Sequence, residues 1–229
     1  MTHIDARFDG RSFAAILFDM DGTLLSSIEA AERVWTRWAA RFGIDARTFL
    51  HDIHGRRAVD SVRRLNIPGV DPEAEAAAIT LAEIDDVEGV RAIPGAKQFV
   101  AMVPNERWAI VTSAPRALAV RRLEAAGLST PSVFITAEDI PRGKPDPACY
   151  QMAAGKLGWS ADDCLVFEDA AAGIRAGEAA GAAVAVITAT HQHPMETSHP
   201  SYADYRGLHV TVRPDGRLQV AHNTGSRNI

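Results

Sequence analysis

Five short apolar runs, each about as long as one β-strand, recur along this chain. They occupy residues 13–18, 108–111, 133–135, 164–167 and 183–187. Continuous apolar runs of this length are typical of strands that are buried on both faces of a parallel sheet. Helical stretches separate the later runs at residues 115–126, 147–157 and 170–180, and each is followed directly by a glycine. This alternation predicts an α/β fold with a doubly wound, Rossmann-like parallel sheet.

The long segment between the first two apolar runs has a different pattern. Ser26 and Glu29 have the spacing of a capping box that would begin a helix, and Trp35 lies on the apolar face of that helix. Further helices are predicted at residues 49–65 and 73–84. We therefore expect a small α-helical domain here, with Trp35 in its core.

This pattern divides the chain into a discontinuous α/β core and an inserted helical domain. The predicted boundaries place residues 12–25 and 93–221 in the core and residues 26–92 in the insert. The last strands of the core are expected to form a hairpin, with residues 208–212 pairing with residues 217–220. Residues 222–229 are expected to form a loose tail.

Charge and cysteine content exclude several other classes of protein. A net charge of −5 is unusual for a protein that binds nucleic acid, and no apolar run is long enough for a membrane-spanning helix. Residues 1–12 lack the pattern of a secretory signal. The two cysteines, Cys149 and Cys164, cannot form a disulfide framework. We therefore expect a cytoplasmic monomer or weak homodimer with neither nucleic-acid nor membrane partners.

Side chains that can carry chemistry follow the apolar runs, where the strands are predicted to end. They are Asp19 and Asp21 after the first run, Thr112 and Ser113 after the second, Lys144 after the third, and Glu168 and Asp169 after the fourth. Ligands of doubly wound sheets bind at this edge. Four carboxylates would repel one another there unless a cation balanced them, and oxygen ligands suit Mg²⁺. A carboxylate can also attack phosphorus while Lys and Thr hold the phosphoryl oxygens, so the pattern predicts phosphoryl transfer.

These residues resemble a known family in their order and spacing. Residues 19–23 (DMDGT), Thr112, Lys144 and the pair at 168–169 are similar to the four motifs of the haloacid dehalogenase (HAD) superfamily. The helical insert that follows the first motif resembles the α-helical cap of the phosphatases and phosphomutases in that superfamily. The resemblance extends over residues 13–187.

Shorter stretches are similar to one subgroup of that superfamily. Residues 32–35 (ERVW), 53–55 (IHG) and 111–113 (VTS) resemble bacterial sugar-phosphate phosphatases and their glycerol-phosphate phosphatase relatives. The sequence departs from the family at Ala148, where an Asp is common. Asp146 is expected to cap the following helix in its place.

The resemblance implies a role for each motif residue. Asp19 would attack phosphorus, and Asp21 would protonate the leaving oxygen and then activate water. Thr112 and Lys144 would bind the transferring phosphoryl group. Either the Thr112 or the Ser113 hydroxyl could face the phosphate, and we favour Thr112 as the side-chain ligand, with Ser113 offering its backbone N–H.

The resemblance also implies a Mg²⁺ ion. Asp19, the backbone carbonyl of Asp21, and Asp169 would hold this ion. Glu168 would lie nearby or act through water.

The predicted insert contains a polar cluster between two helical stretches. His54, Arg56 and Arg57 make up this cluster, and Glu29 is a further, weaker candidate. If the insert closes on the core, these side chains would contact the part of the substrate that is not phosphate. They could equally belong to a solvated loop.

Several functions remain to be compared on the same scaffold. A phosphatase of a small sugar or polyol phosphate agrees best with the motifs, and a phosphomutase resembling β-phosphoglucomutase is the main alternative. A phosphonate hydrolase would need a Lys in the insert, but residues 26–92 contain none. A dehalogenase would not need the general acid Asp21. A non-catalytic protein that binds phosphorylated metabolites is a further alternative, although it should have lost Asp19 or Asp21.

Overall fold

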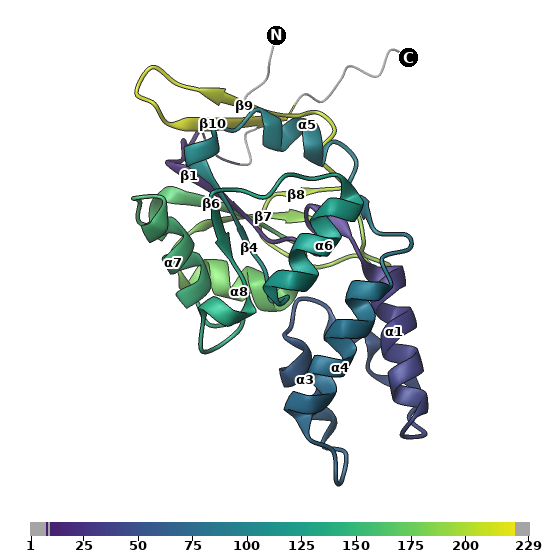
Figure 1. Ribbon diagram of the computed structural model, residues 1–229. Helices are drawn as coiled ribbons and strands as arrows, with labels where there is room; N and C mark the ends of the chain where they lie inside the picture. Colours follow the sequence, from purple (N-terminus) through teal and green to yellow (C-terminus); the bar gives the residue numbers. More distant parts are fainter. Residues whose placement is uncertain (1–7, 9, 223–229) are drawn as a thin grey trace, which may run out of the picture.

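The computed structural model of the protein describes Phe8 and residues 10–222 (Figure 1). A central sheet has six strands in the order β5-β4-β1-β6-β7-β8, and all neighbouring strands are parallel. The strands are β1 (Ala15–Phe18), β4 (Trp108–Val111), β5 (Val133–Ile135), β6 (Cys164–Glu168), β7 (Ala183–Ile187) and β8 (Ser201–Tyr202). The chain builds the sheet outward from β1, first on one side and then on the other. The predicted doubly wound α/β class is therefore confirmed.

Both faces of the sheet are covered, because successive strand residues point to opposite sides. Helices α5 (Ala96–Ala101) and α6 (Arg116–Ala126) pack on the face that contains Phe18, whereas α7 (Ala148–Lys156) and α8 (Ala171–Ala179) pack on the face that contains Leu17 (Figure 1). The predicted hairpin forms from β9 (Leu208–Val212) and β10 (Leu218–His222), beside α5.

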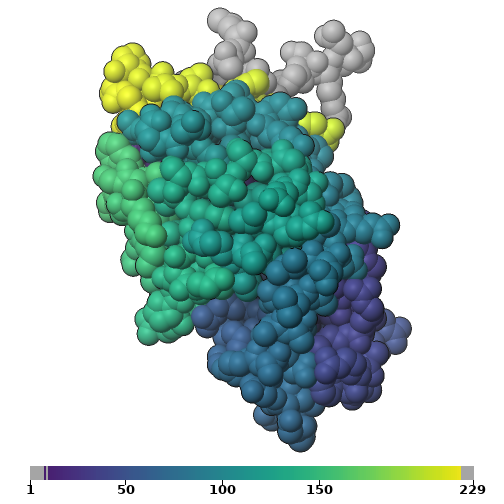
Figure 2. Space-filling model, viewed as in Figure 1, coloured from purple at the N-terminus to yellow at the C-terminus, as the bar shows by residue number. Residues whose placement is uncertain are grey.

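Four helices between β2 and β3 form a lobe beside this core (Figure 2). They are α1 (Ile28–Ala40), α2 (Leu50–Ile53), α3 (Ala58–Leu65) and α4 (Pro72–Asp85). The lobe has its own apolar core, in which Trp35 and Trp38 pack edge to face against each other. We refer to the lobe as the cap. The boundaries of residues 26–92 for the inserted domain stay a prediction.

Two short strands join the cap to the core. Strand β2 (Leu25–Ser26) leads into the cap, β3 (Arg91–Ala92) leads out of it, and the two pair in antiparallel fashion. The predicted capping box is wrong, because Ser26 ends β2 and pairs with Arg91. Ser27 is the N-cap residue of α1, and its hydroxyl donates a hydrogen bond to Asp21 instead of capping the helix.

Two features near the C-terminal end of the described chain differ from the predictions. Strand β8 lies in a segment for which no strand was predicted, and its two residues extend the edge of the sheet. His222 closes β10 and is not part of a tail, while the rest of the predicted tail, residues 223–229, lies outside the described residues. No helix in the described part of the chain is long and apolar enough to cross a membrane.

Candidate active site

Asp19 lies directly after β1, beside the point where the order of strands in the sheet reverses. Its backbone N–H donates to the carbonyl of Phe167 at 2.9 Å, which ties this loop to β6. The side chain is buried, and Lys144 Nζ lies 2.5 Å from Oδ1. Among the described residues, Oδ2 has no hydrogen-bond partner. One carboxylate oxygen is therefore held and the other is available.

Lys144 is held by three oxygen acceptors at once. Besides Asp19, Nζ donates to Glu168 Oε1 at 2.7 Å and to the Val111 carbonyl at 3.1 Å. Burial favours the neutral amine, but Asp19 and Glu168 raise the pKa of Lys144 well above its ordinary value. The amine therefore remains an ammonium ion in the interior.

Asp19, Glu168 and Asp169 form a buried carboxylate cluster. One oxygen from each lies within 4.8 Å of the other two. Burial raises the pKa of Asp19 to about 8, against the attraction of Lys144, and burial also raises the pKa of Asp169 well above its ordinary value. One ammonium ion does not balance three carboxylates. The set of oxygen donors from Asp19, Glu168 and Asp169 fits a small hard cation.

The loop after β1 passes close to this cluster at Gly22. This residue has φ +89°, and a Cβ atom added to it would lie 1.9 Å from Asp169 Oδ2. Only glycine can therefore bring this backbone so close to the Asp169 carboxylate. His191 Nε2 lies 2.8 Å from the backbone carbonyl oxygen of Asp169.

Glu168 is fully occupied by hydrogen-bond donors. Its Oε1 accepts from Lys144 and from the Tyr150 hydroxyl, and its Oε2 accepts from the backbone N–H groups of Asp169 and Ala170. These contacts favour a role in positioning Lys144 and the loop after β6.

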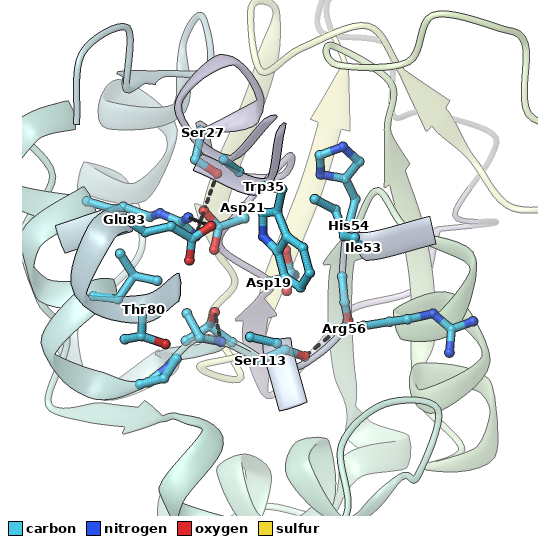
Figure 3. A pocket seen from close by; sticks show the side chains of 18 residues that line it. Asp19, Asp21, Ser27, Trp35, Ile53, His54, Arg56, Thr80, Glu83 and Ser113 are labelled. Atoms are coloured by element: carbon cyan, nitrogen blue, oxygen red, sulfur yellow. Dashed lines mark hydrogen bonds and ion pairs between the residues drawn. The ribbon is translucent and has the colours of Figure 1, made fainter. Parts of the chain in front are cut away.

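The Asp21 carboxylate points toward the cap (Figure 3). Its Oδ1 accepts from the Ser27 hydroxyl at 2.6 Å and from Arg122 Nη1 at 3.0 Å. Arg122 lies on α6, and its Nη2 also lies 3.1 Å from Glu83 Oε1 on α4 of the cap. Both Arg122 and Glu83 are buried. This chain of contacts connects Asp21 to the cap.

The two hydroxyl groups after β4 have different partners. Thr112 is buried and its Oγ1 accepts from the backbone N–H of Ala114 at 3.1 Å, so its hydroxyl hydrogen is still available. Ser113 Oγ donates to the carbonyl of Gly55 at 3.1 Å. Ser113 therefore uses its side chain to hold the cap against the core.

A cavity of about 70 Å³ lies between the core and the cap (Figure 3). The predicted site residues that line it are Asp19, Asp21, Thr112, Ser113, His54 and Arg56. Lys144, Glu168 and Asp169 do not line this cavity, but they are buried next to Asp19 through the contacts above.

The structure separates the four predicted cap residues. His54 lines the cavity, and burial lowers its pKa although Glu32 opposes this shift. Arg56 also lines the cavity, but its guanidinium points away from Asp19 (Figure 3). Arg57 lies outside the lining and joins Asp60 to the Pro141 carbonyl of the core.

Glu29 is also outside this lining. Its side chain is 60% exposed and lies 3.3 Å from Arg91. Glu29, the weaker of the predicted candidates for substrate contact, is therefore not part of the lining of this cavity.

Sequence reasoning missed several side chains that line the cavity. They include Ser27, Trp35, Thr80, Glu83 and Arg122, of which Trp35 was assigned only to the core of the insert. Arg122 and Glu83 lie within predicted helices, where a charged residue normally faces water. No motif marks them, since their pairing depends on how the cap packs against α6.

Comparison with known proteins agrees with this geometry. The family model of haloacid dehalogenase-like hydrolases matches residues 13–181. Hexitol phosphatase A of Escherichia coli is 40% identical, over 89% of this chain and 97% of that protein. The 2-deoxyglucose-6-phosphate phosphatase 1 of Saccharomyces cerevisiae is 34% identical, over 76% of this chain and 80% of that protein.

A solved structure has the same fold. A hydrolase from Pseudomonas syringae aligns with a TM-score of 0.71 at 24% identity, over 82% of this chain and 93% of that one. The match to the family model covers most of the chain, including β1, the cap and the loops that carry Asp19, Lys144 and Asp169. The chain belongs to the haloacid dehalogenase-like hydrolase family.

Proposed function

We propose that the protein is a Mg²⁺-dependent phosphatase that hydrolyses a small sugar or polyol phosphate. The observation that carries the proposal is the pair formed by Asp19 and Lys144. Lys144 holds one oxygen of Asp19, while the other oxygen has no partner within the described residues and the side chain lines the cavity. Relatives named as hexitol phosphatase and 2-deoxyglucose-6-phosphate phosphatase support this class of substrate.

The reaction begins when Oδ2 of Asp19 attacks phosphorus. The new O–P bond forms as the bond from phosphorus to the substrate oxygen breaks, and Asp21 gives its proton to that departing oxygen. A water molecule then attacks phosphorus and gives a proton to Asp21. The bond from phosphorus to Asp19 breaks, which releases inorganic phosphate and restores both carboxyl groups.

Lys144 and Thr112 stabilise the charge that this reaction develops. Glu168 and the Val111 carbonyl hold the ammonium of Lys144 next to Asp19, so its positive charge lies beside the proposed nucleophile and stabilises negative charge on the phosphoryl group. The Thr112 hydroxyl hydrogen and the backbone N–H of Ser113 provide further donors.

The buried carboxylates fit a Mg²⁺ ion. Asp19, the backbone carbonyl of Asp21, and Asp169 would hold it, and Glu168 would support it through Lys144 and the loop after β6. A Mg²⁺ ion at this position would neutralise negative charge on the phosphoryl group. We further propose that the protein acts in the cytoplasm as a monomer or weak homodimer.

A phosphate-release assay tests the proposal. Purified protein with Mg²⁺ is given hexitol, hexose, deoxyhexose and glycerol phosphates, and we expect inorganic phosphate from at least one of them. Asp19→Asn should reduce release by at least about a thousandfold while circular dichroism stays unchanged. Normal release by Asp19→Asn would overturn the assignment of the nucleophile.

The same samples separate the phosphatase from its alternatives. Interconversion of hexose phosphate isomers without release of phosphate would indicate a phosphomutase. Binding of the esters without any turnover would indicate a non-catalytic binding protein.

A further inference from the structure

The wall of the cavity that faces Asp19 contains an ion pair to which no family motif assigns a role. Glu83 of the cap and Arg122 of the core both line the cavity, and only 7% and 8% of their side chains is exposed. We infer that the Glu83–Arg122 pair makes the site selective for neutral polyhydroxy phosphates and against phosphate esters that carry a carboxylate. The inference rests on the proposed function and specifies the substrate class of the same site.

Arg122 has no unbalanced charge to offer a substrate. Its Nη1 lies 3.0 Å from Asp21 Oδ1 and its Nη2 lies 3.1 Å from Glu83 Oε1. Two carboxylates therefore face one guanidinium. Since Asp21 carries a proton when the ester binds, the Glu83 carboxylate balances the guanidinium, and this wall of the cavity offers no unpaired positive charge.

The other basic side chains that line the cavity do not change this balance. Burial lowers the pKa of His54, which favours the neutral imidazole. The guanidinium of Arg56 points away from the cavity (Figure 3). Among the described residues that line the cavity, the Arg122 guanidinium is therefore the one positive charge that faces it. Asp21 and Glu83 already pair with that guanidinium.

An ester that occupies this cavity extends from Asp19 toward this wall. With its phosphoryl group at Asp19, the remainder of the substrate contacts the part of the lining that contains Trp35, Thr80 and the Glu83–Arg122 pair. A hydroxyl group can donate to a carboxylate or accept from Thr80 or the guanidinium without a charge penalty. A substrate carboxylate would instead meet Glu83, and repulsion between like charges in a buried site is strong.

Two matched pairs of substrates test this inference. Glycerol phosphate and phosphoglycerate differ only in whether the terminal carbon is an alcohol or a carboxylate, and hexitol phosphate and phosphogluconate differ in the same way. In each pair, kcat/KM of the wild-type protein should favour the alcohol. Glu83→Gln should reduce this preference at least about tenfold, since a neutral amide replaces the charge next to Arg122.

Two further variants separate charge from structure. Glu83→Asp keeps the charge and should retain most of the preference, even if overall turnover falls. Glu75→Gln is the matched control, because Glu75 is on the same helix, pairs with Arg41 at 3.0 Å and lies outside the cavity lining. It should leave the preference unchanged.

The outcomes distinguish this inference from the proposed function. If the wild-type protein hydrolyses both members of a pair equally, or if Glu83→Gln leaves the preference unchanged, the inference is wrong and the phosphatase assignment stands. If no ester in either pair or in the wider panel releases phosphate, the proposed function fails and the inference fails with it.

Discussion

The guanidinium Nη1 of Arg122 lies 3.0 Å from Oδ1 of Asp21, although 101 residues separate the two in the sequence. Arg122 is on α6 and Asp21 is in the loop after β1. The contact holds the carboxylate that we propose as proton donor in one place, and Ser27 donates a second hydrogen bond to the same oxygen. The geometry of proton transfer therefore depends on a helix that contains no family motif.

Replacing Arg122 should affect stability and turnover together. Arg122→Met would leave Glu83 buried without its partner, which should reduce the free energy of unfolding by about 3 kcal/mol in urea titrations. Turnover should fall by about tenfold to a hundredfold, because Asp21 loses its position. Arg116→Met is the control, since Arg116 is on the same helix but its side chain is 48% exposed. Arg116→Met should reduce the free energy of unfolding by less than about 1 kcal/mol. Equal losses of stability in the two variants would contradict a special role for the buried Arg122.

Binding of Mg²⁺ can be measured without any substrate. Ligands that bind only the folded state stabilise it, so the midpoint of thermal unfolding should rise with the concentration of Mg²⁺. Asp169→Asn should abolish this rise, because Asp169 is part of the buried cluster with Asp19 and Glu168. Sodium chloride at matched ionic strength provides the control. A response to Mg²⁺ that is unchanged in Asp169→Asn would place the ion elsewhere.

Gly22→Ala should damage the same site through the backbone. The new Cβ atom would overlap Asp169, and φ +89° is unfavourable for alanine. We expect a loss of both phosphate release and the thermal response to Mg²⁺. Gly69→Ala is the matched control, since Gly69 has φ +76° and space for a Cβ atom. Gly69→Ala would introduce the unfavourable backbone angle without any overlap with a neighbouring side chain. Full activity of Gly22→Ala would contradict the close packing of Gly22 against Asp169.

A pH titration of stability tests an ion-pair cluster in the cap. Hydrogen bonds from Arg33 and Arg37 lower the pKa of Asp86 from 3.8 to about 2. A lowered pKa in the folded state stabilises the fold above about pH 4, and this contribution is lost as the pH falls toward 2. Asp86→Asn should therefore flatten the dependence of unfolding free energy on pH in that window. An identical slope for the variant and the wild-type protein would contradict the prediction.

The core of the site could be predicted because sheet topology brings its parts together. Asp19, Thr112 and Asp169 follow strands that are parallel, so their meeting at one edge requires only the correct order of strands. The hydrogen bonds of Glu168 could not be predicted, because they depend on Tyr150 from α7 and on the exact path of the following loop.

The cap was predicted less well, for a physical reason. Its helices have clear apolar faces, but sequence periodicity does not show which polar residues the core will cover. Glu83 is buried only because α4 packs beside α6, and Glu29 is exposed because α1 turns that side chain toward Arg91. The predicted capping box at Ser26 failed for a similar reason, because it too depends on a contact between distant segments. Ser26 pairs with Arg91 in a strand of two residues, which is too short to recognise from the sequence pattern.

The pairing of Leu25 with Ala92 and of Ser26 with Arg91 has a consequence for how such proteins can diversify. The chain leaves and re-enters the α/β core at neighbouring hydrogen-bonded positions. A segment of another length or fold whose ends lie equally close could be grafted there without moving β1 or its carboxylate. The carboxylates of the core could thus keep their positions while the residues that the cap contributes to substrate selection change.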